Sequence, residues 1–174
     1  MGTVQAIEFT TPQADKSKLG FTFKQMGVAV DGNFRKFSTK LAFDPAKPEK
    51  ASATLEIDLA SIDAGSDEAN DEVKNQAWFN TKAYPTAKFV SSAVKSLGGG
   101  RYEVSGTMTI KGRSKPAVAP FTFKQEGNTG VFEGAFVLKR ADFAIGEGQW
   151  ADFGTVANEI QIRFRVVATA ATGK

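Results

Sequence analysis

Acidic side chains are the residues of this chain best suited to acid–base chemistry, because it contains neither histidine nor cysteine. Their absence removes the usual general base, the thiol nucleophile and every Ser-His-Asp or Cys-His arrangement. Glu147, Asp152 and Glu159 lie near Trp150, and a pair of carboxylates beside an aromatic ring is what a glycosidase needs. Their spacing does not fix the separation of the carboxylates, and the segment is rich in glycine and loop-like. We therefore interpret them as exposed loop acids and expect no catalytic residue and no enzyme activity.

The other charged residues indicate neither a metal site nor a nucleic-acid surface. No DxDxDG-type calcium loop is present, so the acids alone give no support for a bound metal. The 22 Lys and Arg residues against 19 Asp and Glu give a net charge of +3, which is mild for a nucleic-acid binder. Acids gather at 63–72, and Lys111, Arg113 and Lys115 cluster around a glycine. We interpret both runs as solvated loop surfaces.

An aromatic stretch, Trp78 to Phe89, is the most informative segment of the chain. It reads WFNTKAYPTAKF and lies between a helix-like segment and a strand-like one. Tyr84 precedes Pro85, and a residue before proline avoids the helical region, so the next strand is entered in an extended conformation. The stretch predicts aromatic side chains gathered at one end of a β structure.

A single helix is expected from about 66 to 76. Ser66 is suited to cap its first turn, and the two acids that follow suit the positive end of its dipole. Trp78 and Phe79 come directly after this segment. The helix should therefore deliver both aromatic side chains to one end of the fold, as a lid.

Period-two alternation of apolar and polar residues recurs along the chain, which is typical of strands with one apolar face. Turn signals such as the glycine run at 98–100 and GNTG at 127–130 connect neighbouring runs through short loops. The strands should therefore be antiparallel and consecutive in space, and about eight in number. The apolar faces are Leu19, Phe21 and Phe23; Phe37, Leu41 and Phe43; Leu55, Ile57 and Leu59; Tyr102, Val104, Met108 and Ile110; Phe132, Phe136 and Leu138; and Ile160, Ile162, Phe164 and Val166.

Such a sheet must close into a barrel or pack as a sandwich, because its edges and its apolar face both need cover. We expect an all-β fold, a single antiparallel eight-stranded barrel with the short helix near its mouth. No internal repeat or linker indicates a second domain, so 1–174 is expected to be one domain.

The interior of an eight-stranded barrel is either filled by its own side chains or holds one slender ligand. The 15 Phe residues supply bulk, whereas Gly20, Gly32, Gly106 and Gly134 fall within or beside strands and mark bulges, corners or close approach of a ligand. The composition leaves both alternatives open. A ligand held by apolar walls would need about ten to twenty buried carbons, because burying a CH₂ group contributes about 0.8 kcal/mol and association costs about 4–15 kcal/mol. A chain lipid meets that requirement.

Membrane-spanning and signal segments are not apparent. No apolar run approaches the length of about 20 residues that spans a bilayer, and the first 30 residues lack a basic-then-apolar signal pattern. We expect a soluble mature domain.

Four segments occur in an order that is typical of one protein family. FKQMGVAVDGNFRKFSTKLAFDP at 23–45 is similar to a segment in which a Phe-x-x-x-x-Gly-Val run leads through Gly-x-Phe to Phe-Asp-Pro, although here three residues separate Phe23 from Gly27. LASIDAG at 59–65, WFNTKAYPTAKFVSS at 78–92 and GTMTIKGRSKPAVAPF at 106–121 follow it. Together they resemble the YceI-like family of bacterial polyisoprenoid-binding proteins, which have a lipocalin-like barrel. The resemblance spans about residues 17 to 166.

The resemblance implies a hydrophobic bore that takes an extended isoprenoid tail, of a polyprenyl or ubiquinone-type lipid, without catalysis and with no cofactor besides that ligand. Carried over to this chain, it gives candidate wall residues and candidates near the mouth. The wall candidates are Phe21, Phe23, Phe34, Phe37, Leu41, Leu55, Ile57, Phe89, Met108, Phe121 and Phe136, and the mouth candidates are Trp78, Phe79 and Trp150.

The segment 142–160 resembles a subgroup that carries an Ile-Gly-x-Gly-x-Trp run. Some members of that subgroup are fused to, or encoded beside, membrane cytochrome b-type proteins. The resemblance therefore implies a quinone or another isoprenoid of an electron-transfer membrane, with the membrane or such a cytochrome as a partner. Family members are usually exported, which implies a periplasmic or secreted location. A homodimer stays open, and no nucleic-acid partner is expected.

Two departures from the family pattern concern the ligand's head group. Gln25 stands where many members have histidine, and residues 69–72 replace an Arg-Asp-x-His pattern. Both changes remove cationic or titratable groups, so the resemblance gives no support for a head-group contact at these positions. A diphosphate would have to use Lys111, Arg113 and Lys115, whereas a neutral quinone would not. We therefore favour a neutral isoprenoid head.

Two other functions stay open. A carbohydrate-active or carbohydrate-binding β domain would use exposed Trp and Tyr with loop acids, although Trp78 and Trp150 lie within apolar segments. A ligand-free interaction domain would instead have a filled core.

Overall fold

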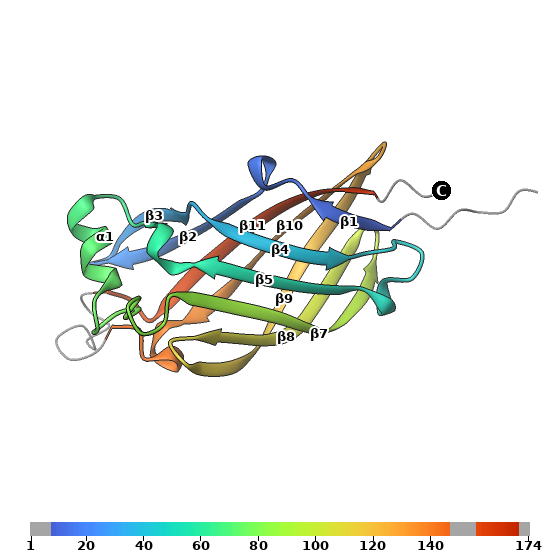
Figure 1. Cartoon of the computed structure of the whole chain (residues 1–174). Helices are drawn as coiled ribbons and strands as arrows, with labels where there is room; N and C mark the ends of the chain where they lie inside the picture. Colours follow the sequence, from blue (N-terminus) through green and yellow to red (C-terminus); the bar gives the residue numbers. More distant parts are fainter. Residues whose placement is uncertain (1–7, 147–155, 171–174) are drawn as a thin grey trace, which may run out of the picture.

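The structure is a computed structural model that describes residues 8–146 and 156–170 (Figure 1). Its elements are eleven strands, four short 3₁₀ segments and the helix α1 (Asp67–Lys74). The strands are β1 (Phe9–Pro12), β2 (Lys18–Gln25), β3 (Val28–Phe34), β4 (Phe37–Ala42), β5 (Ser52–Asp58), β6 (Ile62–Asp63), β7 (Thr86–Gly98), β8 (Arg101–Ile110), β9 (Arg113–Glu126), β10 (Thr129–Lys139) and β11 (Glu159–Ala170). The 3₁₀ segments are Ala14–Lys16, Pro48–Lys50, Leu59–Ser61 and Arg140–Phe143.

The expected all-β antiparallel fold is confirmed, but the expected number of eight strands was wrong. β1 and β6 have four and two residues, which is too short for an alternating pattern to show. In β3 the alternation is interrupted by Asp31, Gly32 and Asn33. These three elements account for the difference.

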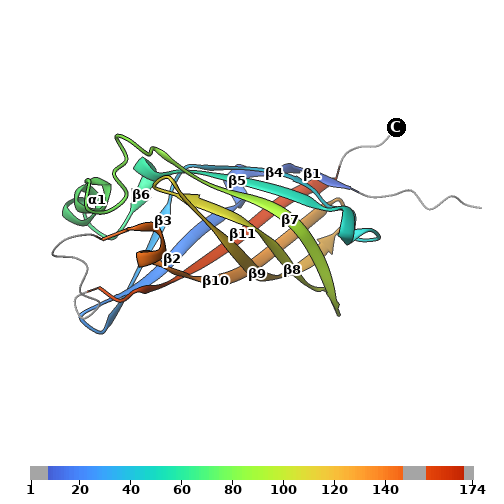
Figure 2. The ribbon, with the colours of Figure 1, turned by 90° about the horizontal axis from the view of Figure 1, so that it is seen from below.

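The strands form one sheet in the order β4-β5-β7-β8-β9-β10-β11-β2-β3-β6, and the strand pairs are antiparallel. β1 pairs with β11, and Phe9 exchanges backbone hydrogen bonds of 2.8 and 3.1 Å with Phe43, directly after β4. At the other end the backbone N–H of Arg35 donates to the carbonyl of Ser61, which follows β5. The sheet therefore curls round (Figure 2), and β1 bridges β11 to the end of β4.

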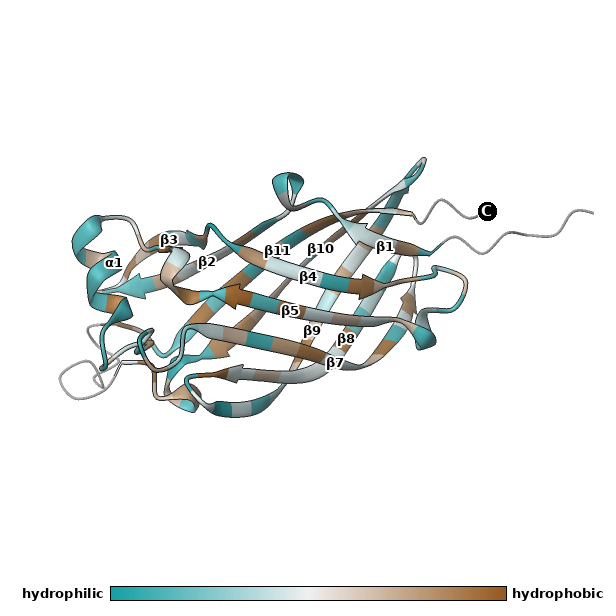
Figure 3. Cartoon of the chain, in the orientation of Figure 1, coloured by the Kyte–Doolittle hydropathy of each residue, from teal (hydrophilic) through white to brown (hydrophobic). Residues whose placement is uncertain are grey.

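Apolar and polar residues alternate along the strands, whereas α1 is mostly hydrophilic (Figure 3). The end of the barrel opposite α1 is filled by an aromatic cluster around Phe43. The ring centroid of Phe43 lies between 4.8 and 6.3 Å from the rings of Tyr102, Phe121, Phe123 and Phe132. Rings at such separations attract one another beyond the area that they bury. This end of the barrel is consequently closed by side chains.

The helix α1 lies at the other end, as the sequence predicted (Figure 1). The side chain of Ser66 accepts a hydrogen bond of 3.1 Å from the backbone N–H of Ala69, which caps the first turn. The helix is eight residues long and ends at Lys74. It is too short to be stable alone, so the segments on either side of it must hold it in place.

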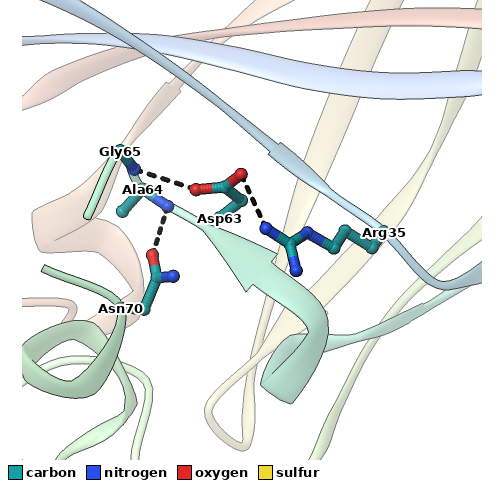
Figure 4. Close-up of polar contacts among 5 residues, drawn as sticks. All are labelled: Arg35, Asp63, Ala64, Gly65 and Asn70. Atoms are coloured by element: carbon teal, nitrogen blue, oxygen red, sulfur yellow. Dashed lines mark hydrogen bonds and ion pairs between the residues drawn. The ribbon is translucent and has the colours of Figure 1, made fainter. Parts of the chain in front are cut away.

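Polar contacts fasten the segment that leads into α1 (Figure 4). Asp63 accepts a hydrogen bond of 3.0 Å from Arg35 and one of 3.1 Å from the backbone N–H of Gly65. Asn70, on α1, accepts from the backbone N–H of Ala64. The guanidinium of Arg35, and after it the N–H of Gly65, lower the pKa of the Asp63 carboxyl.

Because the folded-state pKa of Asp63 is depressed, its ionised form stabilises the fold above the unfolded pKa of about 4. That contribution is lost as the pH falls through the folded pKa. We expect Asp63→Asn to be less stable than wild type at pH 7, and the difference to shrink as the pH falls below about 4. Urea unfolding from pH 7 to pH 2.5 measures this difference, with Glu126→Gln, at the exposed end of β9, as the control. A stability difference between wild type and Asp63→Asn that stays constant over this pH range would contradict the stabilising role of the ionised Asp63 carboxyl.

The β2–β3 turn carries a residue that is unfavourable both for the backbone and for solvation. Met26 and Gly27 have φ values of 50° and 81°, as in the type I′ turn of a two-residue hairpin, which favours Asn-Gly. The Met26 side chain is 77% exposed. We expect Met26→Asn to raise the free energy of unfolding by up to about 1 kcal/mol, because Asn tolerates the left-handed region.

Urea unfolding measures the effect of Met26→Asn. Leu97→Asn is the control, because Leu97 is also exposed, at 47%, and lies next to a turn, but its φ is not positive. A fall in the unfolding midpoint of Met26→Asn would contradict the prediction.

Candidate binding cavity

The interior of the barrel contains two adjoining cavities. The larger, of about 430 Å³, lies beneath α1, and we call it the helix-side chamber. The smaller, of about 130 Å³, lies toward the aromatic cluster, and we call it the far chamber. The larger volume falls in the range of about 300–1,000 Å³ that is usual for ligand pockets.

The walls of both chambers are almost entirely apolar. Polar lining residues of the helix-side chamber lie at its α1 end: Gln25, Ser66, Glu68 and Glu72. Gln25, Ser66 and Glu68 are exposed to solvent, so the chamber reaches the surface beside the helix. In the described part of the chain, the polar residues that line the far chamber are Ser and Thr alone.

Several large apolar side chains of the interior are only half-buried. They include Phe23, Phe37, Phe89, Phe136 and Phe164, all of which line a chamber. In a filled barrel these rings would pack against one another at the density of a protein core. The structure therefore favours the alternative in which the interior holds a ligand.

Every expected site residue that the structure describes lies on the wall of one or both chambers. In the helix-side chamber are Phe21, Phe23, Phe34, Ile57, Trp78 and Phe79; in the far chamber are Phe37, Leu41, Phe89 and Phe121; and on both are Leu55, Met108 and Phe136. Trp150 lies outside the described residues, as do the candidate acids Glu147 and Asp152. Glu159 is exposed at the start of β11, opposite Lys139.

Glycines in the strands leave room for aromatic rings to lie flat against the barrel wall. A Cβ atom added at Gly134 would lie 2.5 Å from the ring of Phe164, and one at Gly106 would lie 2.6 Å from the ring of Phe89. Rings that lie over glycine occupy the wall rather than the lumen. These positions explain why glycine stands within strands, where it otherwise weakens them.

The charged side chains that line the described cavity walls are acidic. Among the described residues that line either chamber, the charged ones are Glu68 and Glu72, and none is Lys or Arg. Arg113 and Lys115 are exposed on β9 and do not border a chamber. The part of the chain that the structure describes thus offers an anionic head group no cation at the cavity walls.

Comparison with known proteins identifies the barrel. The YceI-like domain model matches residues 11–168. The chain belongs to the YceI-like family. A UPF0312 protein of Azotobacter vinelandii is 31% identical over 151 residues, which are 83% of this chain and 77% of the relative.

Solved YceI-like structures have the same fold. The crystal structure of Burkholderia cenocepacia BcnA is 45% identical, with a TM-score of 0.89, and the match covers 91% of this chain and 99% of BcnA. A polyisoprenoid binding domain from Saccharophagus degradans, implicated in plant cell wall breakdown, is 17% identical, with a TM-score of 0.70, and the match covers 96% of this chain and all of that domain. At that identity the second likeness shows the fold alone.

Arg140 is a structural residue of this YceI-like barrel that the sequence did not reveal. Its side chain is 0% exposed, and its guanidinium lies 5.5 Å from the ring centre of Trp78. It donates hydrogen bonds to the carbonyls of Ile145 and Val156, at 3.0 and 2.7 Å, and also to those of Gly146 and Ala157. Desolvation lowers the pKa of the guanidinium. Because Trp78, Ile145 and Val156 line the helix-side chamber, Arg140 holds together part of its wall.

Lys111 corrects the interpretation of the basic run as a solvated loop. Its side chain is buried, and Nζ donates a hydrogen bond of 2.8 Å to the carbonyl of Ala144. The ammonium therefore fastens the β8–β9 turn to the segment after the 3₁₀ turn Arg140–Phe143. It borders neither chamber, so the YceI-like barrel does not present it to a head group there.

No helix of the described residues is long and apolar enough to cross a membrane. Within the same residues, no group of three or more acids is placed to hold a metal ion.

Proposed function

We propose that this YceI-like protein binds and carries a long-chain isoprenoid lipid, of a polyprenyl or ubiquinone type, in its barrel and does not catalyse a reaction. The observation that carries the proposal is the pair of adjoining chambers with apolar walls. The fold is shared with a domain described as polyisoprenoid binding. The periplasmic or secreted location and a membrane or membrane cytochrome b-type partner belong to the same proposal, on the strength of the family.

The chemistry of the walls supports an extended apolar ligand. Each buried CH₂ group contributes about 0.8 kcal/mol, and association costs about 4–15 kcal/mol, so a tail of many carbons is needed for useful affinity. Two chambers in line offer apolar contact to such a tail along the barrel. The described lining offers few groups for acid–base chemistry beyond Glu68 and Glu72, which lie at the α1 end. Binding is therefore the function that this interior serves best.

The carbohydrate alternative has less support. A sugar stacks on exposed aromatic rings, but Trp78 is 6% exposed and faces the helix-side chamber. The ligand-free alternative requires a filled interior, which the half-buried rings of Phe23 and Phe136 argue against. The isoprenoid ligand remains the proposal.

The acidic rim of the helix-side chamber supports a neutral head group. Glu68 and Glu72 line the chamber from α1, whereas Asp71 is exposed on the same helix and does not line it. A diphosphate placed beside two carboxylates would be repelled, whereas a quinone or alcohol would not. The head group of the natural ligand is therefore proposed to be uncharged.

Charge reversal at the rim tests the head group. We expect wild type to gain melting temperature with an isoprenoid quinone but not with a polyprenyl diphosphate of equal tail length. Glu68→Lys combined with Glu72→Lys should shift preference toward the diphosphate by about tenfold, which is a difference of about 1.4 kcal/mol. Asp71→Lys is the matched control and should leave the preference unchanged. Tight binding of the diphosphate by wild type, with no binding of the quinone, would overturn the neutral head.

A further inference from the structure

Among the residues that the structure describes, five side chains border both chambers of the barrel. They are Leu19 on β2, Leu55 on β5, Met108 on β8, Phe136 on β10 and Phe164 on β11. These strands are distributed around the sheet, so the five side chains approach the lumen from several sides. We call this ring of residues the waist.

One side of the waist is held firmly by the strands. Leu19 and Phe164 are direct cross-strand partners, and the ring of Phe164 lies over Gly134. On the opposite side are Leu55 and Met108, and a methionine side chain adapts to its surroundings more easily than a ring does. A slender tail can therefore pass between a fixed aromatic side and a softer aliphatic one.

Beyond the waist the far chamber is finite. It has about 130 Å³, against about 430 Å³ on the helix side. The end of the barrel is closed by the cluster around Phe43, in which Phe9 and Phe43 are 0% and 3% exposed. Carbons that cross the waist gain apolar contacts only until this space is filled.

We propose that the waist and the far chamber select isoprenoid tails by length. A short tail fills the helix-side chamber alone, whereas a longer tail crosses the waist, fills the far chamber and is retained. This inference rests on the proposed isoprenoid-binding function. It assigns the selection to residues that border or line the far chamber rather than to the head group.

Ala117 and Val73 offer a matched pair of tests. Ala117, on β9, lines only the far chamber, and Val73, on α1, lines only the helix-side chamber. The affinities of isoprenoid quinones with one head group and increasing tail length are measured for wild type, Ala117→Phe and Val73→Trp. In wild type, affinity should rise with length and then level off.

Ala117→Phe should lower the affinity for the longest quinones at least tenfold and for the shortest less than twofold. The reason is that each CH₂ group kept out of the far chamber lowers affinity about fourfold. Val73→Trp should lower the affinity for quinones of all tail lengths by the same factor. Thermal melting establishes that each variant is folded. Ala53→Phe, which enters the far chamber from β5, repeats the test if Ala117→Phe does not fold.

Two results would overturn length selection: a wild-type affinity that does not depend on tail length, or an equal loss for short and long quinones in both far-chamber variants. Failure of wild type to bind any quinone or polyprenol of the series is a different result. It would overturn the proposed function itself, so the two failures are distinguishable.

Discussion

Replacing Arg140 with methionine is expected to lower the free energy of unfolding by about 3–5 kcal/mol, or to prevent folding. The side chain is fully buried and donates to backbone carbonyls of residues 145, 146, 156 and 157. Leaving a buried acceptor unsatisfied costs about 1–3 kcal/mol, and a domain of this size has only about 5–15 kcal/mol of stability. Methionine retains an apolar side chain of similar length, so the loss of unfolding free energy measures the contribution of the guanidinium group.

Chemical unfolding followed by circular dichroism measures this loss. Arg101→Met is the control, because Arg101 is exposed at the start of β8, and surface changes usually stay within about 0.5 kcal/mol. Arg140→Lys retains a positive charge and some donors, so it should fall between wild type and Arg140→Met. An Arg140→Met variant within about 1 kcal/mol of wild type would show that the carbonyls find other donors.

Adding one methyl group at Gly134 is expected to destabilise the barrel by about 1–3 kcal/mol. The new Cβ would lie 2.4 Å from the carbonyl oxygen of Pro120 and 2.5 Å from the ring of Phe164. Both neighbours are fixed in the sheet, since Gly134 is paired with Phe121 on one side and with Phe164 on the other. The ring must therefore move toward the lumen, which also narrows the waist.

Gly20→Ala is the matched control. It lies in β2, and a Cβ there would meet its nearest atom, the carbonyl oxygen of Gly32, at 3.4 Å, an ordinary contact. This substitution should be neutral or stabilise by up to about 1 kcal/mol, because alanine restricts the unfolded chain. Both variants are compared by urea unfolding. Equal stability of Gly134→Ala and Gly20→Ala would contradict the view that glycine holds the Phe164 ring against the wall.

Local sequence patterns predicted much of the fold. Leu19, Phe21 and Phe23 alternate with polar residues and do share the inner face of β2, and Ser66 caps the helix where expected. Short pairing segments carried no such pattern. β1 and β6 exist because Phe9 and Ile62 find partners far away in the chain, which is tertiary information.

The sequence predicted the candidate site as a set of wall residues. It did not predict that the cavity is divided into two chambers by a waist. The waist depends on which side chains of distant strands come to the same level of the barrel, and spacing along one strand does not contain that. Phe164 and Leu19 were recognised as strand-face residues without being placed at the ligand. Arg140 and Lys111 look like ordinary surface cations in the sequence, and only the carbonyls gathered around them reveal their burial.

Native mass spectrometry of the purified protein, followed by organic extraction of the released ligand, tests the central claim most directly. We expect a stoichiometric adduct whose mass corresponds to an isoprenoid with an uncharged head group, because the interior has apolar walls and an acidic rim. Repeated absence of any adduct, with no gain in melting temperature when quinones or polyprenols are added, would contradict the claim and favour a ligand-free interaction domain.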